Sequence, residues 1–183
     1  MSRFGKILVV VSLAVLAAPF AGYFYYDLVR FQPHRAEILR LVESAEAEDR
    51  ALPVTTAQML IFSLHGDTTH YITRLLLGRL NLSQGQWLMH SGIWESLVRL
   101  HLTEHDRLTI VASTVSTSGN RRGLSATARA LYGKPLSQLS LDETARLIVL
   151  ANYSTSWNNP ARLAEASNQF LARYQESQKV QRD

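Results

Sequence analysis

An uncharged apolar run near the N-terminus constrains the arrangement of this 183-residue chain more than any other feature. Between Ile7 and Tyr26, every residue except Ser12 is apolar or aromatic. About 20 such residues in a helix span the hydrocarbon core of a bilayer. The run therefore predicts a membrane helix, with the remaining residues on one side of the membrane.

The residues at the two ends of this run predict its orientation. Arg3 and Lys6 precede it, and basic residues tend to stay in the cytoplasm. Aromatic residues at 20 and 23–26 crowd the far end, as is typical of a membrane interface. A cleaved signal peptide is the alternative, but Val15-Leu16-Ala17 is a poor cleavage site and the apolar run continues beyond it. We expect a single-pass anchor in the inner (cytoplasmic) membrane, ordered as a cytoplasmic N-terminus 1–6, an anchor 7–26, an outer or periplasmic domain 27–178 and a polar tail 179–183.

Charge and cysteine content exclude several functions. The formal net charge is +4, and the basic residues are spread along the chain rather than gathered in a block. This pattern does not favour nucleic-acid binding, whereas it suits anionic lipid headgroups and pyrophosphate equally well. The absence of cysteine excludes disulfides and thiolate metal sites. No strand pattern competes with the helical periodicity, so we expect one all-α domain of about seven to nine helices behind the anchor.

Residues 123–160 carry the clearest local signals. A short amphipathic helix is expected to end at Gly133, since glycine adopts the left-handed conformation common after helix ends. Ser140 and Glu143 have the spacing of a capping box. Asn159-Pro160 is expected to open the last helix. The segment therefore predicts three consecutive helices with short connections.

This segment also resembles the C-terminal part of family 51 glycosyltransferases, the peptidoglycan polymerases (transglycosylases) that occur alone or in bifunctional penicillin-binding proteins. The resemblance covers about a fifth of the chain and lies in the packing part of the family fold. It implies a lysozyme-like lobe and a role in cell-wall synthesis. The residues in register are Gly123, Ala126, Ala128, Tyr132, Gly133, Lys134, Leu139, Leu141, Glu143, Ala145, Leu147, Asn159 and Pro160.

By this resemblance, Glu48 is the general base. Glu48, Asp49 and Arg50 match the start of the family's Glu-Asp-(Arg/Lys) motif, although its later His and Gly are missing. A polymerase needs a carboxylate that takes the proton from the acceptor sugar's hydroxyl as it attacks the donor. The alternative is that Glu48 belongs to the solvated acidic end of a helix running from Pro33 to Asp49. The resemblance also places Arg50 near the substrate.

Two further motifs are matched in part. Ile72 and Thr73 lie in the register of the family's lipid-binding helix, with Arg74 and Leu75 at its two Gln positions. Glu95 stands at the second catalytic carboxylate, but the basic pair that precedes it in the family is missing. Leaving pyrophosphate normally requires Arg, Lys or a metal. The candidate replacements, each of which could instead be a solvated surface residue, are Arg74, Arg79, Arg121 and Arg122.

A histidine metal site has little support. His101 and His105 lie four residues apart, but Thr103 is expected to start a helix between them, and no third ligand is apparent. The cofactor therefore stays unknown, with a divalent cation expected only for an active polymerase.

Two hypotheses remain. The chain is either a divergent polymerase of lipid-linked disaccharide units or a non-catalytic relative. Such a relative would bind the lipid-linked glycan precursor or cell-wall synthesis proteins at the lipid bilayer. Glu48 and Glu95 are the expected catalytic residues, and Arg50, Thr73, Arg74, Arg121 and Arg122 are the expected substrate-binding residues.

Overall fold

The structure is a computed structural model that describes residues 3–78, 84–117, 121–152 and 159–180. It is all-helical apart from one antiparallel pair of two-residue strands, in which Ser116 faces Arg122. The prediction of an all-α chain is confirmed. In chain order the elements are α1 (Arg3–Tyr26), a π-helix η1 (Asp27–Phe31), α2 (Gln32–Glu43), α3 (Ala47–Arg50), α4 (Val54–Ser63), α5 (Thr68–Leu77), α6 (Gln84–His101), α7 (Glu104–Thr114), β1 (Ser116–Thr117), β2 (Arg121–Arg122), α8 (Leu124–Tyr132), a 3-10 helix η2 (Leu136–Gln138), α9 (Leu141–Asn152) and α10 (Pro160–Val180).

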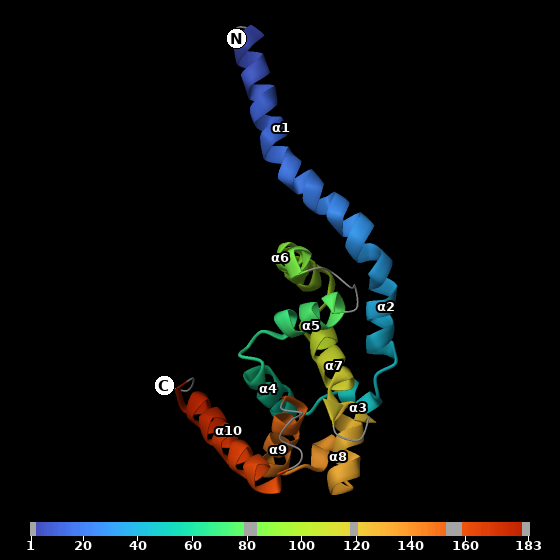
Figure 1. The fold of residues 1–183 in the computed structure, drawn as a ribbon, viewed down its shortest axis with the longest axis vertical. Helices are drawn as coiled ribbons and strands as arrows, with labels where there is room; N and C mark the ends of the chain where they lie inside the picture. The colour runs from blue at the N-terminus through green and yellow to red at the C-terminus, as the bar shows by residue number, and fades with distance from the viewer. Residues whose placement is uncertain (1–2, 79–83, 118–120, 153–158, 181–183) are drawn as a thin grey trace.

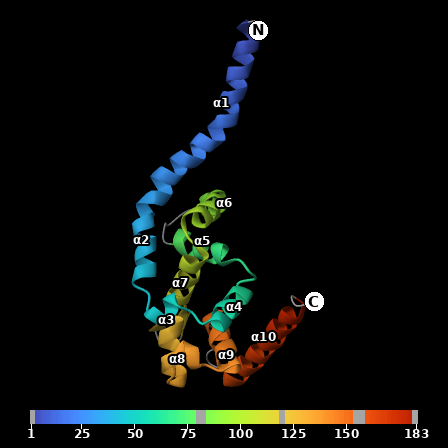
Figure 2. The ribbon, with the colours of Figure 1, turned by 180° about the vertical axis from the view of Figure 1, so that it is seen from behind.

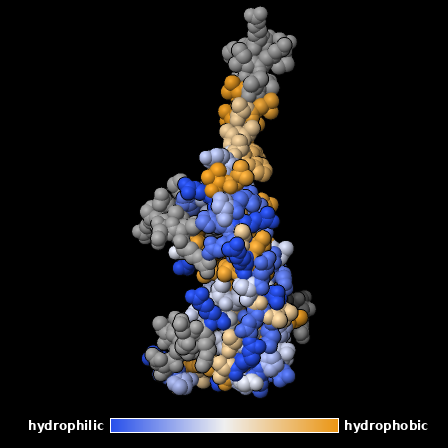
Figure 3. Space-filling model, turned by 90° about the vertical axis from the view of Figure 1, so that its right-hand side faces the viewer, coloured by the Kyte–Doolittle hydropathy of each residue, from blue (hydrophilic) through white to orange (hydrophobic). Residues whose placement is uncertain are grey.

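The N-terminal helix projects away from the remaining helices (Figures 1 and 2). In the part of the chain that the structure describes, one helical stretch, Val11–Glu43, is long and apolar enough to cross a membrane, and only 6% of its most apolar window is buried. Side chains such as Leu16 and Phe24 are about two-thirds exposed. Figure 3 shows this stretch in orange and tan above a mostly blue body. An exposed apolar helix of this length is what a membrane anchor requires.

The anchor joins the domain through the π-helix η1. Asp27 accepts two contacts from Nε2 of His101, at 3.1 and 3.0 Å, and both side chains are largely buried. Tyr26 accepts a hydrogen bond from Trp94 Nε1 at 3.0 Å. Phe31 is fully buried and stacks on the His101 ring at a centroid distance of 5.0 Å. These contacts hold the end of α1 and the π-helix η1 against α6.

The helix predicted from Pro33 to Asp49 is confirmed as far as Glu43, but it does not continue through residues 44–49. The helix α2 ends at Glu43, and Glu46 is extended, with ψ at 151°, before the short helix α3 begins. Ala45 is buried at this break, and α3 packs against α7 and α8. The chain turns here because tertiary packing outweighs the helix propensity of an Ala- and Glu-rich stretch.

The domain core lies around α7 and α9. The helix α7 packs against α2, α3, α5 and α8, whereas α9 packs against α4, α8 and α10. The core includes part of the leucine run on α5, since Leu76 and Leu77 are buried. The largest fully buried side chains are Trp94, Phe31, Ile38, Met59, Leu60, Ile72, Leu77, Leu97, Ile110, Leu124, Leu136 and Leu147.

The helix ends predicted from local sequence are confirmed. Gly133 ends α8 in the left-handed conformation, with φ at +65°. Ser140 and Glu143 form both hydrogen bonds of a capping box, at 2.8 and 3.2 Å. The Asn159 side chain accepts the first backbone N–H groups of α10, and Thr103 caps α7. Ser83, where the sequence also predicts a helix cap, lies outside the described residues.

Candidate functional site

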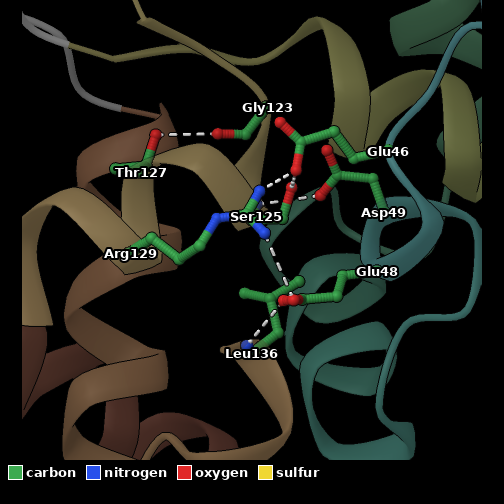
Figure 4. A network of polar contacts seen from close by, with 8 residues as sticks. All are labelled: Glu46, Glu48, Asp49, Gly123, Ser125, Thr127, Arg129 and Leu136. Atoms are coloured by element: carbon green, nitrogen blue, oxygen red, sulfur yellow. Dashed lines mark hydrogen bonds and ion pairs between the residues drawn. The ribbon is translucent and has the colours of Figure 1, made fainter. Parts of the chain in front are cut away.

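Three acidic side chains from α3 and the residue before it meet the start of α8 and the chain that follows α8 (Figure 4). The acidic residues are Glu46, Glu48 and Asp49, and we call this meeting point the α3–α8 joint. It forms because the chain is extended at Glu46, which turns α3 toward α8. The joint contains the predicted base, so its hydrogen bonds determine what Glu48 can do.

Asp49 acts as the N-cap of a helix that lies 76 positions away in sequence. Its Oδ1 accepts the backbone N–H of Ser125 at 2.9 Å. The residue at the N-cap position of α8 is Gly123, which has no side chain to cap the helix. A Cβ on Gly123 would lie 2.7 Å from Asp49 Oδ2, so the carboxylate occupies the space where a cap residue's side chain would begin. Burial raises the pKa of Asp49, and the Ser125 hydrogen bonds only partly oppose this effect.

Glu48 is half-buried, and both of its carboxylate oxygens are engaged. Oε2 accepts the backbone N–H of Leu136 at 3.0 Å, at the start of η2. Oε1 lies 3.4 Å from a guanidinium nitrogen of Arg129 (Figure 4). Glu48 therefore connects α3 both to α8 and to the segment that joins α8 to α9.

Glu46 completes the joint. Its Oε2 accepts the hydroxyl of Ser125 at 3.1 Å and pairs with Arg129. Sequence reasoning did not select Ser125 or Arg129. The available signal was their spacing of four residues, which places two polar side chains on one face of α8. No feature of the sequence predicted that this face of α8 would contact α3.

The second predicted carboxylate belongs to another network. Glu95 lies on α6 and pairs with Nδ1 of His70 on α5 at 2.8 Å. The described contacts of Glu48 and Glu95 share no residue, and α3 and α6 stand apart in Figures 1 and 2. Neither carboxylate is among the lining residues of the cavities of about 670, 610 and 380 Å³. The structure therefore does not bring the two predicted catalytic groups together.

The predicted substrate-binding residues are dispersed. Thr73 is buried on α5, and its hydroxyl has no hydrogen-bond partner among the described residues. Arg74 is exposed and lines an open cavity of about 610 Å³ together with His70. Arg50 and Arg122 are exposed at the end of α3 and in β2. The Arg121 side chain and Arg79 lie outside what the structure describes.

No metal centre is formed by the described residues, because no three of their acidic or histidine side chains are grouped to hold an ion. The joint itself does not fit a cation, since the Arg129 guanidinium already lies against the carboxylates of Glu46 and Glu48 and would repel it. His101 is engaged by Asp27, whereas His105 is exposed in the first turn of α7. We therefore derive no chemistry through a divalent ion.

Comparison with models of known protein families found no match, and comparison with curated proteins found none either.

Proposed function

We propose that this chain is a membrane-anchored, non-catalytic relative of family 51 glycosyltransferases that binds the lipid-linked disaccharide precursor of the cell wall. The observation that carries the proposal is the state of Glu48, whose two oxygens are held by Leu136 N–H and Arg129. A general base has to reach the substrate hydroxyl, and these two contacts direct the Glu48 carboxylate toward α8 and η2 instead. A carboxylate whose contacts hold two helices together stabilises the fold instead.

We also propose an architecture for the domain and a location in the cell. The helices from α2 to α10 would correspond to a lysozyme-like lobe, and the anchor would hold it on the outer side of the inner membrane. Arg74 is the basic residue best placed to meet a pyrophosphate. It is exposed, and it lines a cavity whose wall also includes the apolar residues Leu64 and Leu75. A lipid-linked pyrophosphate combines a charged head with an apolar tail, and the cavity combines a basic residue with apolar ones.

A polymerase is the second candidate function. It is favoured by Glu95, which is partly exposed and pairs with His70 beside the cavity that Arg74 lines. A carboxylate and a guanidinium close to one cavity are groups that glycosyl transfer from pyrophosphate would use. A polymerase would also need its other expected catalytic carboxylate, Glu48, at this cavity, but Glu48 lies in the separate network of the α3–α8 joint.

One experiment separates the two functions. The full chain in nanodiscs receives lipid-linked disaccharide-pentapeptide, with and without divalent metal, and both binding and polymer are measured. We expect saturable binding and no glycan chains, and we expect Glu48→Gln to bind as well as the parent chain. Arg74→Ala should weaken binding by about tenfold if it meets a phosphate, whereas Arg162→Ala on α10 should not. Glycan chains that disappear in Glu48→Gln would establish the polymerase instead.

A further inference from the structure

A second cavity, away from both carboxylate networks, lies between α4 and α10, with α9 beneath it. Its volume is about 670 Å³, within the range typical of small-molecule sites. Figure 1 shows α4, α9 and α10 in the lower part of the domain, with α10 leading to the C-terminus. Neither Glu48 nor Glu95 lines this cavity. The cavity shares Ser63 and His65 with the cavity that Arg74 lines, so the two lie next to one another, and Arg173 lines this one alone.

The wall of this cavity is aromatic and aliphatic. Phe62 on α4 and Phe170 on α10 meet edge to face at a centroid distance of 5.5 Å. Ile61 and Val149 complete the apolar part of the lining. The Tyr174 hydroxyl donates to Gln58 at 3.1 Å behind the aromatic pair, which holds α4 against α10. A flat or branched apolar group can therefore rest against a preformed surface.

Among the described lining residues of this cavity, Arg173 is the one with a permanent charge. The lining residues described by the structure include no Asp or Glu, whereas Arg173 and His65 both line it. Nε of Arg173 donates to the carbonyl of Gln169 at 3.3 Å, which fixes the guanidinium along α10. The two terminal nitrogens of Arg173 have no partner among the described residues. A guanidinium held in this way can donate two hydrogen bonds to one carboxylate or phosphate.

His65 is unusual in its backbone. Its φ is +54°, and it is the one described residue other than glycine with a positive φ. The next residue, Gly66, has a φ of +79°. Glycine adopts this conformation without a Cβ clash, so a histidine here is less favourable for the backbone than glycine would be. Residues held in such conformations are often found at binding sites.

We propose that this cavity binds an amphipathic organic anion, with a ring-containing apolar body against Phe62 and Phe170 and one anionic head at Arg173 and His65. The head is a carboxylate, sulfonate or phosphate, since each accepts the paired donors of a guanidinium. The apolar body provides affinity by burial, and the head sets the orientation.

The test uses the full chain in nanodiscs and titrates 2-naphthoate, with the neutral 2-naphthamide as a matched probe and empty nanodiscs as the blank. We expect saturable binding of 2-naphthoate that is at least about tenfold tighter than that of 2-naphthamide, because only the anion pairs with Arg173. Equal binding of the two probes, or no saturable binding beyond the blank, would overturn the proposal.

Two variants then test the residues. Arg173→Gln should weaken 2-naphthoate binding by about tenfold, while Arg162→Gln at the start of the same helix should leave it unchanged. His65→Gly should also weaken binding, yet its thermal midpoint should stay the same or rise because glycine adopts the +54° φ freely. The assignment would be contradicted if both single variants fold and each binds 2-naphthoate as tightly as the parent does.

Discussion

Asp49 accepts the backbone N–H of Ser125 at 2.9 Å and so caps a helix that begins 75 residues after it, because the residue at the helix's own cap position is Gly123. The two residues fit one another closely, since the Asp49 carboxylate occupies the space that a side chain on Gly123 would need. This contact closes the α3–α8 joint, so changes to either residue should alter the stability of the fold.

Asp49→Asn should change how stability depends on pH. Burial raises the pKa of Asp49 above its ordinary value of 3.8. Its protonated form is therefore favoured in the folded state. That contribution to the free energy of unfolding is fully present below about pH 3.8 and is lost as pH rises through the raised value. Asparagine keeps an acceptor oxygen but does not titrate, so denaturant unfolding from pH 3 upward should show a parent-minus-variant difference that falls with pH. A constant difference over that range would contradict this account.

Asp49→Ala removes the cap itself and serves as the comparison. It leaves the Ser125 N–H buried without an acceptor, which should lower the free energy of unfolding by about 1–3 kcal/mol relative to Asp49→Asn. That difference should be the same at every pH, because neither replacement titrates.

Gly123→Ala should be strongly destabilising, by about 2–4 kcal/mol. Its φ is +98°, and the new Cβ would lie 2.7 Å from Asp49 Oδ2. The specific check is a double-mutant cycle with Asp49→Ala, because shortening Asp49 removes the atom that the Cβ meets. The double variant should be more stable than the sum of the single effects predicts. Simple additivity would mean that the close approach of the two residues is not the cause. Gly92→Ala is the matched control, since a Cβ there meets no atom within 4 Å.

Asp27→Ala should loosen the junction between anchor and domain. The Asp27 and His101 side chains are only 12% and 16% exposed, so removing one partner leaves the other poorly solvated. A loss of about 1–3 kcal/mol in the stability of this junction is expected. Trypsin should then cut faster after the exposed Arg30 in the π-helix, with the full chain in nanodiscs as substrate. Glu176→Ala on α10 is the control, and equal cleavage rates in all three chains would show that the pair does not hold the junction.

Glu143→Gln should make the free energy of unfolding depend less on pH in the acid range. The Lys134 ammonium, with the Ser140 N–H, holds the pKa of Glu143 below its usual value of 4.5. A lowered value means that the contribution is present above about pH 4.5 and is lost as pH falls through the folded-state value. Because the ion pair is partly exposed, added salt should reduce the effect. Unfolding at low and high salt, with Asp142→Asn as the control, measures both dependences.

The sequence by itself determined the features that depend on near neighbours. The long, exposed apolar helix at the N-terminus follows from the uncharged run 7–26, and the ends of α8, α9 and α10 follow from Gly133, Ser140 with Glu143, and Asn159. A cap or a membrane span is decided by residues within one or two turns, so the pattern carries enough information.

Only the tertiary structure decided what the acidic residues do. Glu48 had the sequence context of a catalytic base, yet its partners Arg129 and Leu136 lie more than 80 positions away. Whether a carboxylate is a base, an ion-pair partner or a helix cap depends on the donors that face it and on its burial. Those are set by how α3 packs on α8, and no interval of the sequence encodes that contact.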